Sequence, residues 1–141
     1  MRRYVCGFCF SPSAAPREVL LIRKNRPDWQ SGKLNGVGGK IEEGETPLHA
    51  MEREFFEEAG LKDVQWKRFT TLNGSDFCVY FYYAFHGRYD LCVSKTDERL
   101  EVVRVEMLHT YNVIPNLRWL VPMALDHDSQ PLVIHERSLQ P

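Results

Sequence analysis

The sequence has no long hydrophobic run, no excess of charge of one sign, and no low-complexity tract or internal repeat. Its 18 lysines and arginines nearly balance 19 aspartates and glutamates, so the formal net charge is −1. A near-neutral chain without a basic stripe has no global attraction for nucleic acid, and local groups must hold any anionic ligand. The average composition indicates neither disorder nor a membrane span. We therefore expect neither a nucleic-acid partner nor a membrane partner.

The chain also lacks a convincing export signal. An apolar stretch near its start, Tyr4–Phe10, has only the minimum length for a signal sequence and includes a glycine. A buried strand is the better interpretation of this stretch. We therefore expect a cytoplasmic protein whose thiols stay reduced.

Cysteine is sparse, and the four cysteines do not form a recognisable metal set. The CxxC spacing of Cys6 and Cys9 is compatible with redox chemistry or with half of a zinc site. Zinc requires a second ligand pair, whereas Cys78 and Cys92 lie fourteen residues apart with no adjacent histidine. Free cysteines in the core are the favoured interpretation.

The 141 residues suffice for one domain, which we expect to span residues 1–141. The segment Lys24–Gly39 contains several glycines and one proline, so it is expected to be a loop whose backbone approaches a ligand closely. Runs of aromatic and β-branched residues bounded by turn formers predict strands, the first two as a hairpin. These are Tyr4–Phe10, Glu18–Arg23, Val64–Leu72, Phe77–Phe85, Glu101–Met107 and a short tail strand at Leu132–His135.

Two helices are expected. Thr46 as N-cap and Pro47 as first helical residue mark the start of one, and Gly60 marks its end. A second apolar pattern covers residues 117–125, with Pro122 near its start. Strands before, between and after two helices predict an α+β or layered α/β domain. The first helix has an apolar stripe, with spacings of three and four, formed by Leu48, Met51, Phe55 and Ala59.

The first helix also has an acidic side, formed by Glu54, Glu57 and Glu58. Like charges at these spacings repel one another, and a divalent cation would reverse the sign of that interaction. Carboxylate oxygens suit Mg²⁺ or Mn²⁺, and the Gly38-Gly39 turn can add a backbone carbonyl. The alternative is an ordinary solvated acidic face.

The spacing around this helix is more specific than an acidic face. In order come Gly39, five residues, Glu45, seven residues, Arg53-Glu54, apolar Phe55, any residue, Glu57-Glu58, any residue, Gly60 and apolar Leu61. This pattern resembles the Nudix box without a departure. The resemblance implies the Nudix fold, an α/β/α sandwich with a mixed β-sheet between helices, in which the box forms a loop–helix–loop.

The resemblance also implies hydrolysis of a nucleoside diphosphate linked to another group, by water attack on phosphorus with Mg²⁺ (or Mn²⁺). Arg53 resembles the family's structural arginine, whose fork orients a box carboxylate, and Glu45 belongs to the same supporting set. The implied metal ligands are Glu54, Glu58, Glu57 directly or through water, and the carbonyl of Gly38.

No covalent nucleophile is required for this reaction, and the position of the general base varies within the family. Glu98, in the segment Thr96-Asp97-Glu98, is our candidate for the base or for an additional metal ligand, the alternative being a solvated loop charge. The five histidines form no spaced cluster and are expected to be structural or exposed.

The segment Lys33–Lys40 resembles the one before the box in MutT-like nucleoside triphosphatases, including those that hydrolyse oxidised purine nucleotides. Asn35 matches an asparagine that reaches the base there, and Lys40 is a candidate for phosphate contact. The alternative for Asn35 is a loop asparagine in an unusual backbone conformation. Asn116–Pro122 resembles a late helix of the oxidised-purine enzymes and puts Asn116 at the pocket, where those enzymes carry acidic residues.

Two further residues are candidates for substrate contact. Trp29 either stacks on a base or fills the edge of the core, and Arg23 either contacts a phosphate or is a solvated charge. We expect a (d)NTP as substrate, with ADP-ribose or a dinucleotide polyphosphate as the alternative. A non-catalytic, nucleotide-sensing Nudix module is the alternative function, and the chain is expected to be a monomer or a homodimer.

Overall fold

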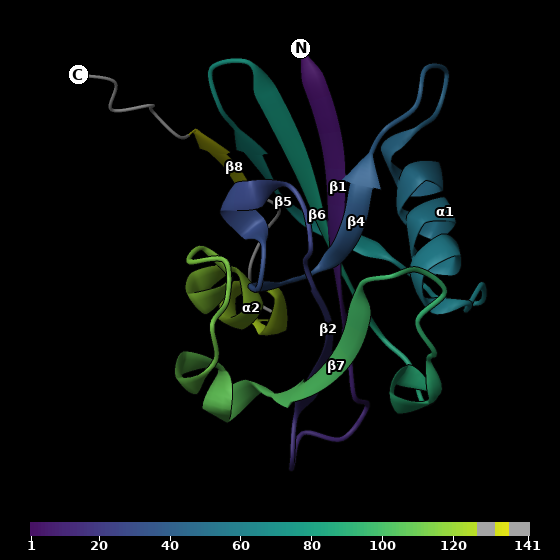
Figure 1. The fold of residues 1–141 in the computed structure, drawn as a ribbon, viewed down its shortest axis with the longest axis vertical. Coiled ribbons are helices and arrows are strands. Elements are labelled where there is room, and N and C mark those ends of the chain that lie inside the picture. Colours follow the sequence, from purple (N-terminus) through teal and green to yellow (C-terminus); the bar gives the residue numbers. More distant parts are fainter. Residues whose placement is uncertain (127–131, 136–141) are drawn as a thin grey trace.

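The computed structural model describes residues 1–126 and 132–135. In this part of the chain, helices α1 (Pro47–Ala59) and α2 (Leu117–Leu125) lie on opposite faces of one sheet (Figure 1). The strands are β1 (Arg2–Phe10), β2 (Glu18–Arg23), β3 (Leu34–Asn35), β4 (Val37–Lys40), β5 (Lys67–Asn73), β6 (Phe77–Phe85), β7 (Arg99–Arg104) and β8 (Leu132–His135).

The sheet is mixed, and β1 lies at its centre. β1 runs parallel to β6 from Arg2↔Phe77 to Phe10↔Phe85, and antiparallel to β2 and β4. β2 also pairs with β7 and β3, and β6 pairs with β5, all antiparallel. β8 runs parallel to β5, so the predicted tail strand is present. The expected hairpin of β1 and β2 and the expected mixed sheet between helices are both confirmed.

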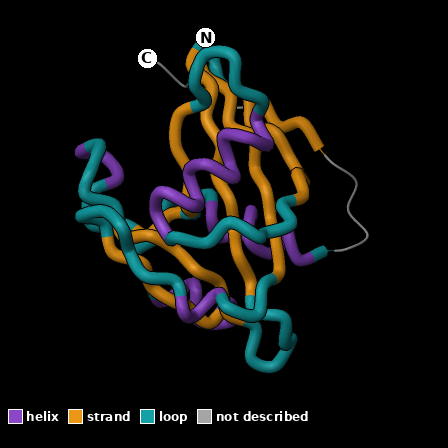
Figure 2. The backbone as a smooth tube through the Cα atoms, turned by 90° about the vertical axis from the view of Figure 1, so that its right-hand side faces the viewer, coloured by secondary structure: helices purple, strands orange, loops and turns teal. Residues whose placement is uncertain are grey.

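Side chains of β1 alternate between two cores, one on each face of the sheet. Phe8 and Phe10 join the core that α2 covers, whereas Val5 and Cys9 join the core that α1 covers. Figure 2 shows α1 lying across the strands on its face of the sheet. The central strand therefore anchors both helices, and α1 is held against the strands that border the acidic cluster.

The alternation also decides the interpretation of the CxxC spacing. Cys6 lies in the core beneath α2 and Cys9 in the core beneath α1, so the two thiols point to opposite faces of the sheet. They cannot share a metal ion or form a disulfide with each other. Burial raises the pKa of both thiols to about 12. Both are free, as is buried Cys78, and Cys92 is half-buried.

The segment Lys24–Gly39 is not the uninterrupted loop that we expected. It contains a 3₁₀ helix, η1 (Asp28–Gln30), and then β3 and β4. A Cβ on Gly38 would lie 1.9 Å from the carbonyl oxygen of Val5, so only a glycine lets β4 pair so closely with β1. The glycines therefore permit close strand pairing here, which composition alone does not distinguish from loop flexibility.

Two strand boundaries also differ from prediction. β5 begins at Lys67 rather than Val64, and β7 ends at Arg104, after which the 3₁₀ helix η3 (Val105–Thr110) replaces the predicted strand. Val64 and Leu108 are nonetheless buried. Apolar residues outside a strand can fill the core, so the hydrophobic pattern extends beyond the hydrogen-bonded ladder.

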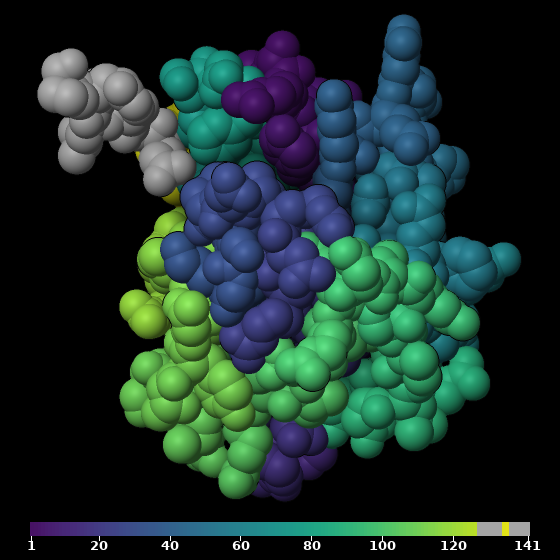
Figure 3. Space-filling view, viewed as in Figure 1, coloured from purple at the N-terminus to yellow at the C-terminus, as the bar shows by residue number. Residues whose placement is uncertain are grey.

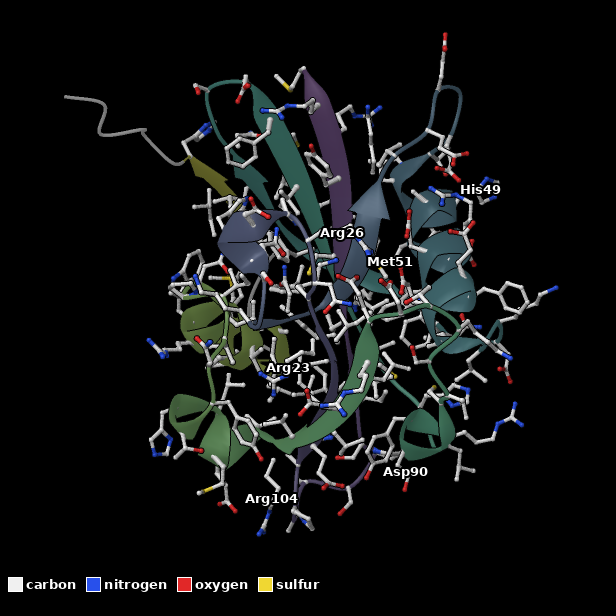
Figure 4. The ribbon with its side chains drawn as sticks, in the orientation of Figure 1. Arg23, Arg26, His49, Met51, Asp90 and Arg104 are labelled. Atoms are coloured by element: carbon white, nitrogen blue, oxygen red, sulfur yellow. The ribbon has the colours of Figure 1, made fainter. Side chains whose placement is uncertain are left out.

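Helix α1 begins and ends as predicted. The backbone N–H of His49 donates to the hydroxyl of Thr46 at 3.2 Å, and Gly60 adopts a left-handed conformation with φ of 78°. Met51 is fully buried, and Figure 4 places it on the sheet side of α1, with His49 on the outer side. Leu48 is 43% exposed, so its assignment to the apolar stripe is wrong, and Ala50 takes that buried place.

Helix α2 retains Pro122 in its interior, and its N-cap Asn116 makes no side-chain cap hydrogen bond. Leu117, Leu120, Val121 and Ala124 are buried against the sheet. None of the helices in residues 1–126 and 132–135 is long and apolar enough to cross a membrane.

Candidate active site

The acidic side of α1 is organised by Arg53, whose guanidinium contacts three box carboxylates. Its Nε and Nη2 donate to the two oxygens of Glu45, at 2.7 and 2.9 Å. Its Nη1 donates to Glu54 at 2.9 Å and to Glu57 at 3.3 Å. Nη2 also reaches the carbonyl of Lys40 at 3.0 Å, which ties α1 to the end of β4. The predicted orienting role of Arg53 and the supporting role of Glu45 both fit this geometry.

Glu54 lies directly on the backbone of β4. A Cβ on Gly39 would stand 2.5 Å from the carboxyl group of Glu54, so glycine leaves the space that this carboxylate fills. One oxygen of Glu54 accepts from Arg53, and the side chain is only 13% exposed. The carboxylate of Glu54 is therefore fixed between α1 and the Gly38-Gly39 backbone.

Glu58 lies one turn further along α1 and is held from a different side. The hydroxyl of Thr96 donates to Oε2 of Glu58 at 3.0 Å, and the backbone N–H of Lys95 donates to the Glu58 carbonyl at 3.0 Å. Gly60, just beyond, leaves room for the side chain of Lys95, because a Cβ there would lie 2.9 Å from Lys95 Cε. The segment before β7 thus docks on the C-terminal end of α1.

Glu98 is buried, with 3% of its surface exposed, and both of its oxygens accept hydrogen bonds. Lys24 Nζ donates to one oxygen at 2.9 Å, and the backbone N–H of Asn25 donates to the other at 2.6 Å. Arg26 pairs with the neighbouring Asp97, so a short segment after β2 is fastened to the segment before β7. Figure 3 shows these two stretches of the chain in contact across one face of the molecule.

Each carboxylate has a different electrostatic setting. Hydrogen bonds from Arg53 lower the pKa of Glu45 to about 2. Burial raises the pKa of Glu54, against the opposing effect of Arg53, and burial likewise raises the pKa of Glu58, against Thr96 and Lys24. Burial also opposes ionisation of Glu98, but hydrogen bonds from Asn25 and Lys24 outweigh it and lower the pKa of that carboxyl group. The site therefore concentrates partly desolvated negative charge around Glu54 and Glu58.

The donor chemistry of this site fits a hard divalent cation that keeps water or substrate oxygens as ligands. Glu54 and Glu58 offer carboxylate oxygens, and the Gly38-Gly39 backbone approaches Glu54 closely. Among the described residues, no three or more His, Cys, Asp or Glu side chains form a metal cage on their own. Mg²⁺ usually binds through one or two carboxylates plus water and substrate phosphates, so a partial protein ligand set suits it. Glu57 is 53% exposed and more loosely held.

The residues predicted to bind substrate lie in differing environments. Arg23 makes a two-bond ion pair with Glu101 and donates to the carbonyl of Gly32 at 3.0 Å, so its guanidinium already has protein partners. Figure 4 shows Arg23 beside β7. Lys40 is exposed at the end of β4. A phosphate contact for either residue stays a prediction.

The oxygen of the Asn35 amide is held on the protein side. Oδ1 accepts from the backbone N–H of Gly36 at 2.8 Å and from the thiol of Cys6 at 3.7 Å, and Nδ2 donates to Gln30 at 3.0 Å. Trp29, in η1, is 62% exposed, so the core-edge alternative for it is wrong. Trp119 of α2 is also 43% exposed. Base contacts by Asn35, Trp29 and Asn116 stay predictions.

For two residues of this site, the sequence did not predict the contacts that the structure shows. Lys24 and Thr96 each contact a predicted catalytic carboxylate, yet neither belongs to the box. The only signal in the sequence was the position of Thr96 two residues before Glu98, a spacing at which a hydroxyl accepts from the backbone N–H. Of the histidines, His86 lies 3.5 Å from Asp63, away from the acidic cluster.

Comparison with known proteins gives a family match for most of the chain. The NUDIX domain matches residues 2–125. The oxidized purine nucleoside triphosphate hydrolase of Mus musculus is 48% identical over 46 residues, which make up 33% of this chain and 29% of that protein. The Danio rerio protein of the same name is 50% identical over 46 residues, with the same coverage of 33% and 29%. The matched region therefore spans less than a third of those relatives.

Solved structures with the same fold include two described as MutT. One, from work on MutT of Aliivibrio salmonicida and Vibrio cholerae, has a TM-score of 0.71 at 23% identity and covers 87% of this chain and 96% of that one. MutT of Bacillus halodurans has a TM-score of 0.73 at 18% identity, with coverage of 97% and 91%. The NUDIX domain of Shewanella oneidensis NrtR, complexed with ADP ribose, has a TM-score of 0.75 at 17% identity, with coverage of 86% and 84%. At these identities the likeness concerns the fold alone.

Proposed function

The chain belongs to the NUDIX family and has its fold, and we propose that it is a divalent-metal-dependent pyrophosphohydrolase acting on a nucleoside triphosphate. The proposed products are a nucleoside monophosphate and pyrophosphate. The observation that carries the proposal is the fixation of two box carboxylates one helical turn apart, with Glu54 held by Arg53 against Gly39 and Glu58 held by Thr96. A module that only senses nucleotides does not need its box carboxylates to be fixed in this way.

The residues divide the work of the reaction. Arg53 holds Glu45 and one oxygen of Glu54, so the second oxygen of Glu54 is free for a metal ion. Glu58 likewise has one oxygen engaged by Thr96 and one free. When bound there, Mg²⁺ or Mn²⁺ would neutralise phosphate oxygens and make a coordinated water more acidic. The carbonyl of Gly38 and the exposed Glu57 would complete or support the ligand set.

Glu98 has a constrained role in this scheme. Its two hydrogen-bonded oxygens and its lowered pKa make it a weak base while Lys24 and Asn25 remain in contact with it. We therefore propose that Glu98 keeps negative charge close to Glu58 and takes a proton only after Lys24 has moved away. A base that must be released by movement of a lysine is still compatible with general-base catalysis.

The substrate proposal rests on a separate observation. The similarity over 46 residues to two oxidized purine nucleoside triphosphate hydrolases supports an oxidised or canonical purine (d)NTP. Nδ2 of Asn35 donates one hydrogen to Gln30, and its second hydrogen can donate to an acceptor on the base. The fold likeness to an ADP-ribose-bound NUDIX domain keeps ADP-ribose as the second candidate substrate.

The proposal is tested by measuring turnover with Mg²⁺ on canonical and oxidised nucleoside triphosphates, ADP-ribose and dinucleotide polyphosphates, ranked by kcat/KM. Glu58→Gln should lower turnover by about a hundredfold or more and leave the fold intact. Glu52→Gln is the matched control, because Glu52 is exposed on the same helix. Equal activity of the two variants would contradict the assignment of Glu58. A preference for ADP-ribose over every triphosphate would contradict the substrate.

A further inference from the structure

We propose that Thr96 is a positioning residue that fixes the Glu58 carboxylate for metal binding, an inference that rests on the proposed function of the same site. Thr96 lies outside the Nudix box, in the connection before β7. Within residues 1–126 and 132–135, its hydroxyl is the one side-chain group that donates a hydrogen bond to Glu58. The orientation of Glu58 therefore depends on a residue that the box does not include.

The Thr96 hydroxyl has three partners within hydrogen-bond distance, two possible acceptors and one donor. It donates to Oε2 of Glu58 at 3.0 Å and accepts from the backbone N–H of Glu98 at 3.2 Å. A hydroxyl has one donor and two acceptor sites, so both bonds can form at once. The carbonyl of Glu98, at 3.5 Å, is a second possible acceptor for the hydroxyl proton, and the shorter distance favours Oε2 of Glu58. The hydroxyl oxygen of Thr96 thus links the carboxylate of Glu58 to the backbone of Glu98.

The hydrogen bond leaves Glu58 with one engaged and one available oxygen. Glu54 has the same arrangement, because Arg53 engages only its Oε1. Two carboxylates on neighbouring turns of the helix can therefore bind the same ion, each through its one free oxygen. Without the Thr96 hydroxyl, Glu58 would rotate among several rotamers, and metal binding would have to order it.

The alternative is that Thr96 only stabilises the turn before β7, and this alternative predicts a different effect on metal binding. Ser94 supports the same turn, since the carbonyls of Thr96, at 3.0 Å, and Glu98 are alternative acceptors for its hydroxyl proton. The Ser94 hydroxyl bonds to these two carbonyls and not to Glu58. If Thr96 only stabilises the turn, then removing the Ser94 hydroxyl should have the same effect on metal binding. The two hydroxyls therefore form a matched pair for experiment.

The test is the affinity of the protein for Mn²⁺ without nucleotide, measured by electron paramagnetic resonance of the free ion. Thr96→Val should raise the Kd for Mn²⁺ about tenfold, a typical cost of removing a group that orients a metal ligand. Thr96→Ser retains the hydroxyl and should bind as the wild type does. Ser94→Ala should also stay close to the wild-type Kd. With Mg²⁺, Thr96→Val should shift the half-activating metal concentration in the same direction.

Each remaining outcome decides against some part of the proposal. Wild-type Mn²⁺ affinity in Thr96→Val, in a protein whose Glu58→Gln variant has lost that affinity, overturns the role of Thr96 and leaves the metal site in place. Unchanged affinity in Glu58→Gln overturns the metal site and the role of Thr96 together. A Thr96→Val protein that does not fold, or an equal loss in Ser94→Ala, assigns Thr96 to turn stability and overturns its positioning role.

Discussion

Arg53 holds both oxygens of Glu45 with two of its own nitrogens, at 2.7 and 2.9 Å, across the loop that precedes α1. Both side chains are largely buried, at 23% and 14% exposure. A guanidinium can make this two-bond contact while also reaching Glu54, whereas an ammonium group concentrates its charge at one atom. The loop, the helix and one carboxylate of the proposed metal site therefore depend on one planar group.

Replacement of Arg53 by lysine should impair catalysis even though lysine keeps the positive charge. We expect Arg53→Lys to lower kcat at least tenfold, because Glu54 loses its fixed partner. Steady-state kinetics at saturating Mg²⁺ would measure this loss. Arg2→Lys is the control, since Arg2 pairs with Asp76 at the exposed surface and should have wild-type kinetics. Equal kinetics in the two variants would contradict the orienting role of Arg53.

The Arg53–Glu45 contact should also make stability depend on acidity. Glu45 has a pKa of about 2 in the folded protein against an ordinary value of 4.5. A depressed folded-state pKa contributes stability above the unfolded-state pKa, and this contribution is lost as the pH falls from about 4.5 to about 2. We expect Glu45→Gln to unfold with a flatter pH dependence across that window. Urea titrations at several pH values would measure the difference, and parallel curves for the two proteins would refute the linkage.

Replacement of Gly38 by alanine should affect stability, whereas replacement of Gly39 by alanine should affect catalysis. The three atoms nearest to a Cβ on Gly39 all belong to the carboxyl end of the Glu54 side chain, so Gly39→Ala should displace that carboxylate and lower kcat while the protein still folds. A Cβ on Gly38 meets the backbone of Val5, so Gly38→Ala should lower the melting temperature. Gly87→Ala is the control, because nothing lies within 4 Å of the added Cβ. Thermal melts and turnover numbers for the three variants would test this separation.

The sequence predicted the box helix well because its signals are local. The cap bond of the Thr46 hydroxyl and the left-handed conformation of Gly60 depend on neighbours within a few residues, and the spacing of the apolar residues marks the side of the helix that is buried. The family pattern placed Arg53 among the box carboxylates for the same reason, since its partners are separated from it by fixed short spacings. Local determinants of this kind can be read without knowledge of the fold.

The remaining parts of the site depend on contacts between distant segments. Lys24 meets Glu98, and Thr96 meets Glu58, only because β2 and β7 are paired and the segment before β7 docks on α1. No spacing rule connects these positions. Arg23 illustrates the same limit, because its ion pair with Glu101 follows from the pairing of β2 with β7 and leaves its predicted phosphate contact without support.

Removal of the Lys24 charge should destabilise the protein far more than removal of the neighbouring Arg26 charge. Lys24 and Glu98 are 19% and 4% exposed, whereas Arg26 and Asp97 are 63% and 60% exposed. A buried carboxylate without its partner costs about 3 kcal/mol or more, and an exposed pair contributes under about 1 kcal/mol. We expect Lys24→Met, compared with Arg26→Met, to show this difference in chemical denaturation. Similar unfolding free energies for the two variants would mean that water solvates the Glu98 carboxylate once Lys24 has been replaced.

The parallel pairing of β1 with β6 also governs when the site can form during synthesis of the chain. The first strand acquires its long partner only after Phe85 has been made, and Glu58 acquires Thr96 later still. When the Gly39–Leu61 segment has been synthesised, the later strands are still missing, so its helix cannot yet pack against a complete sheet. Nascent chains that end before β7 should carry every box residue and yet hydrolyse nothing.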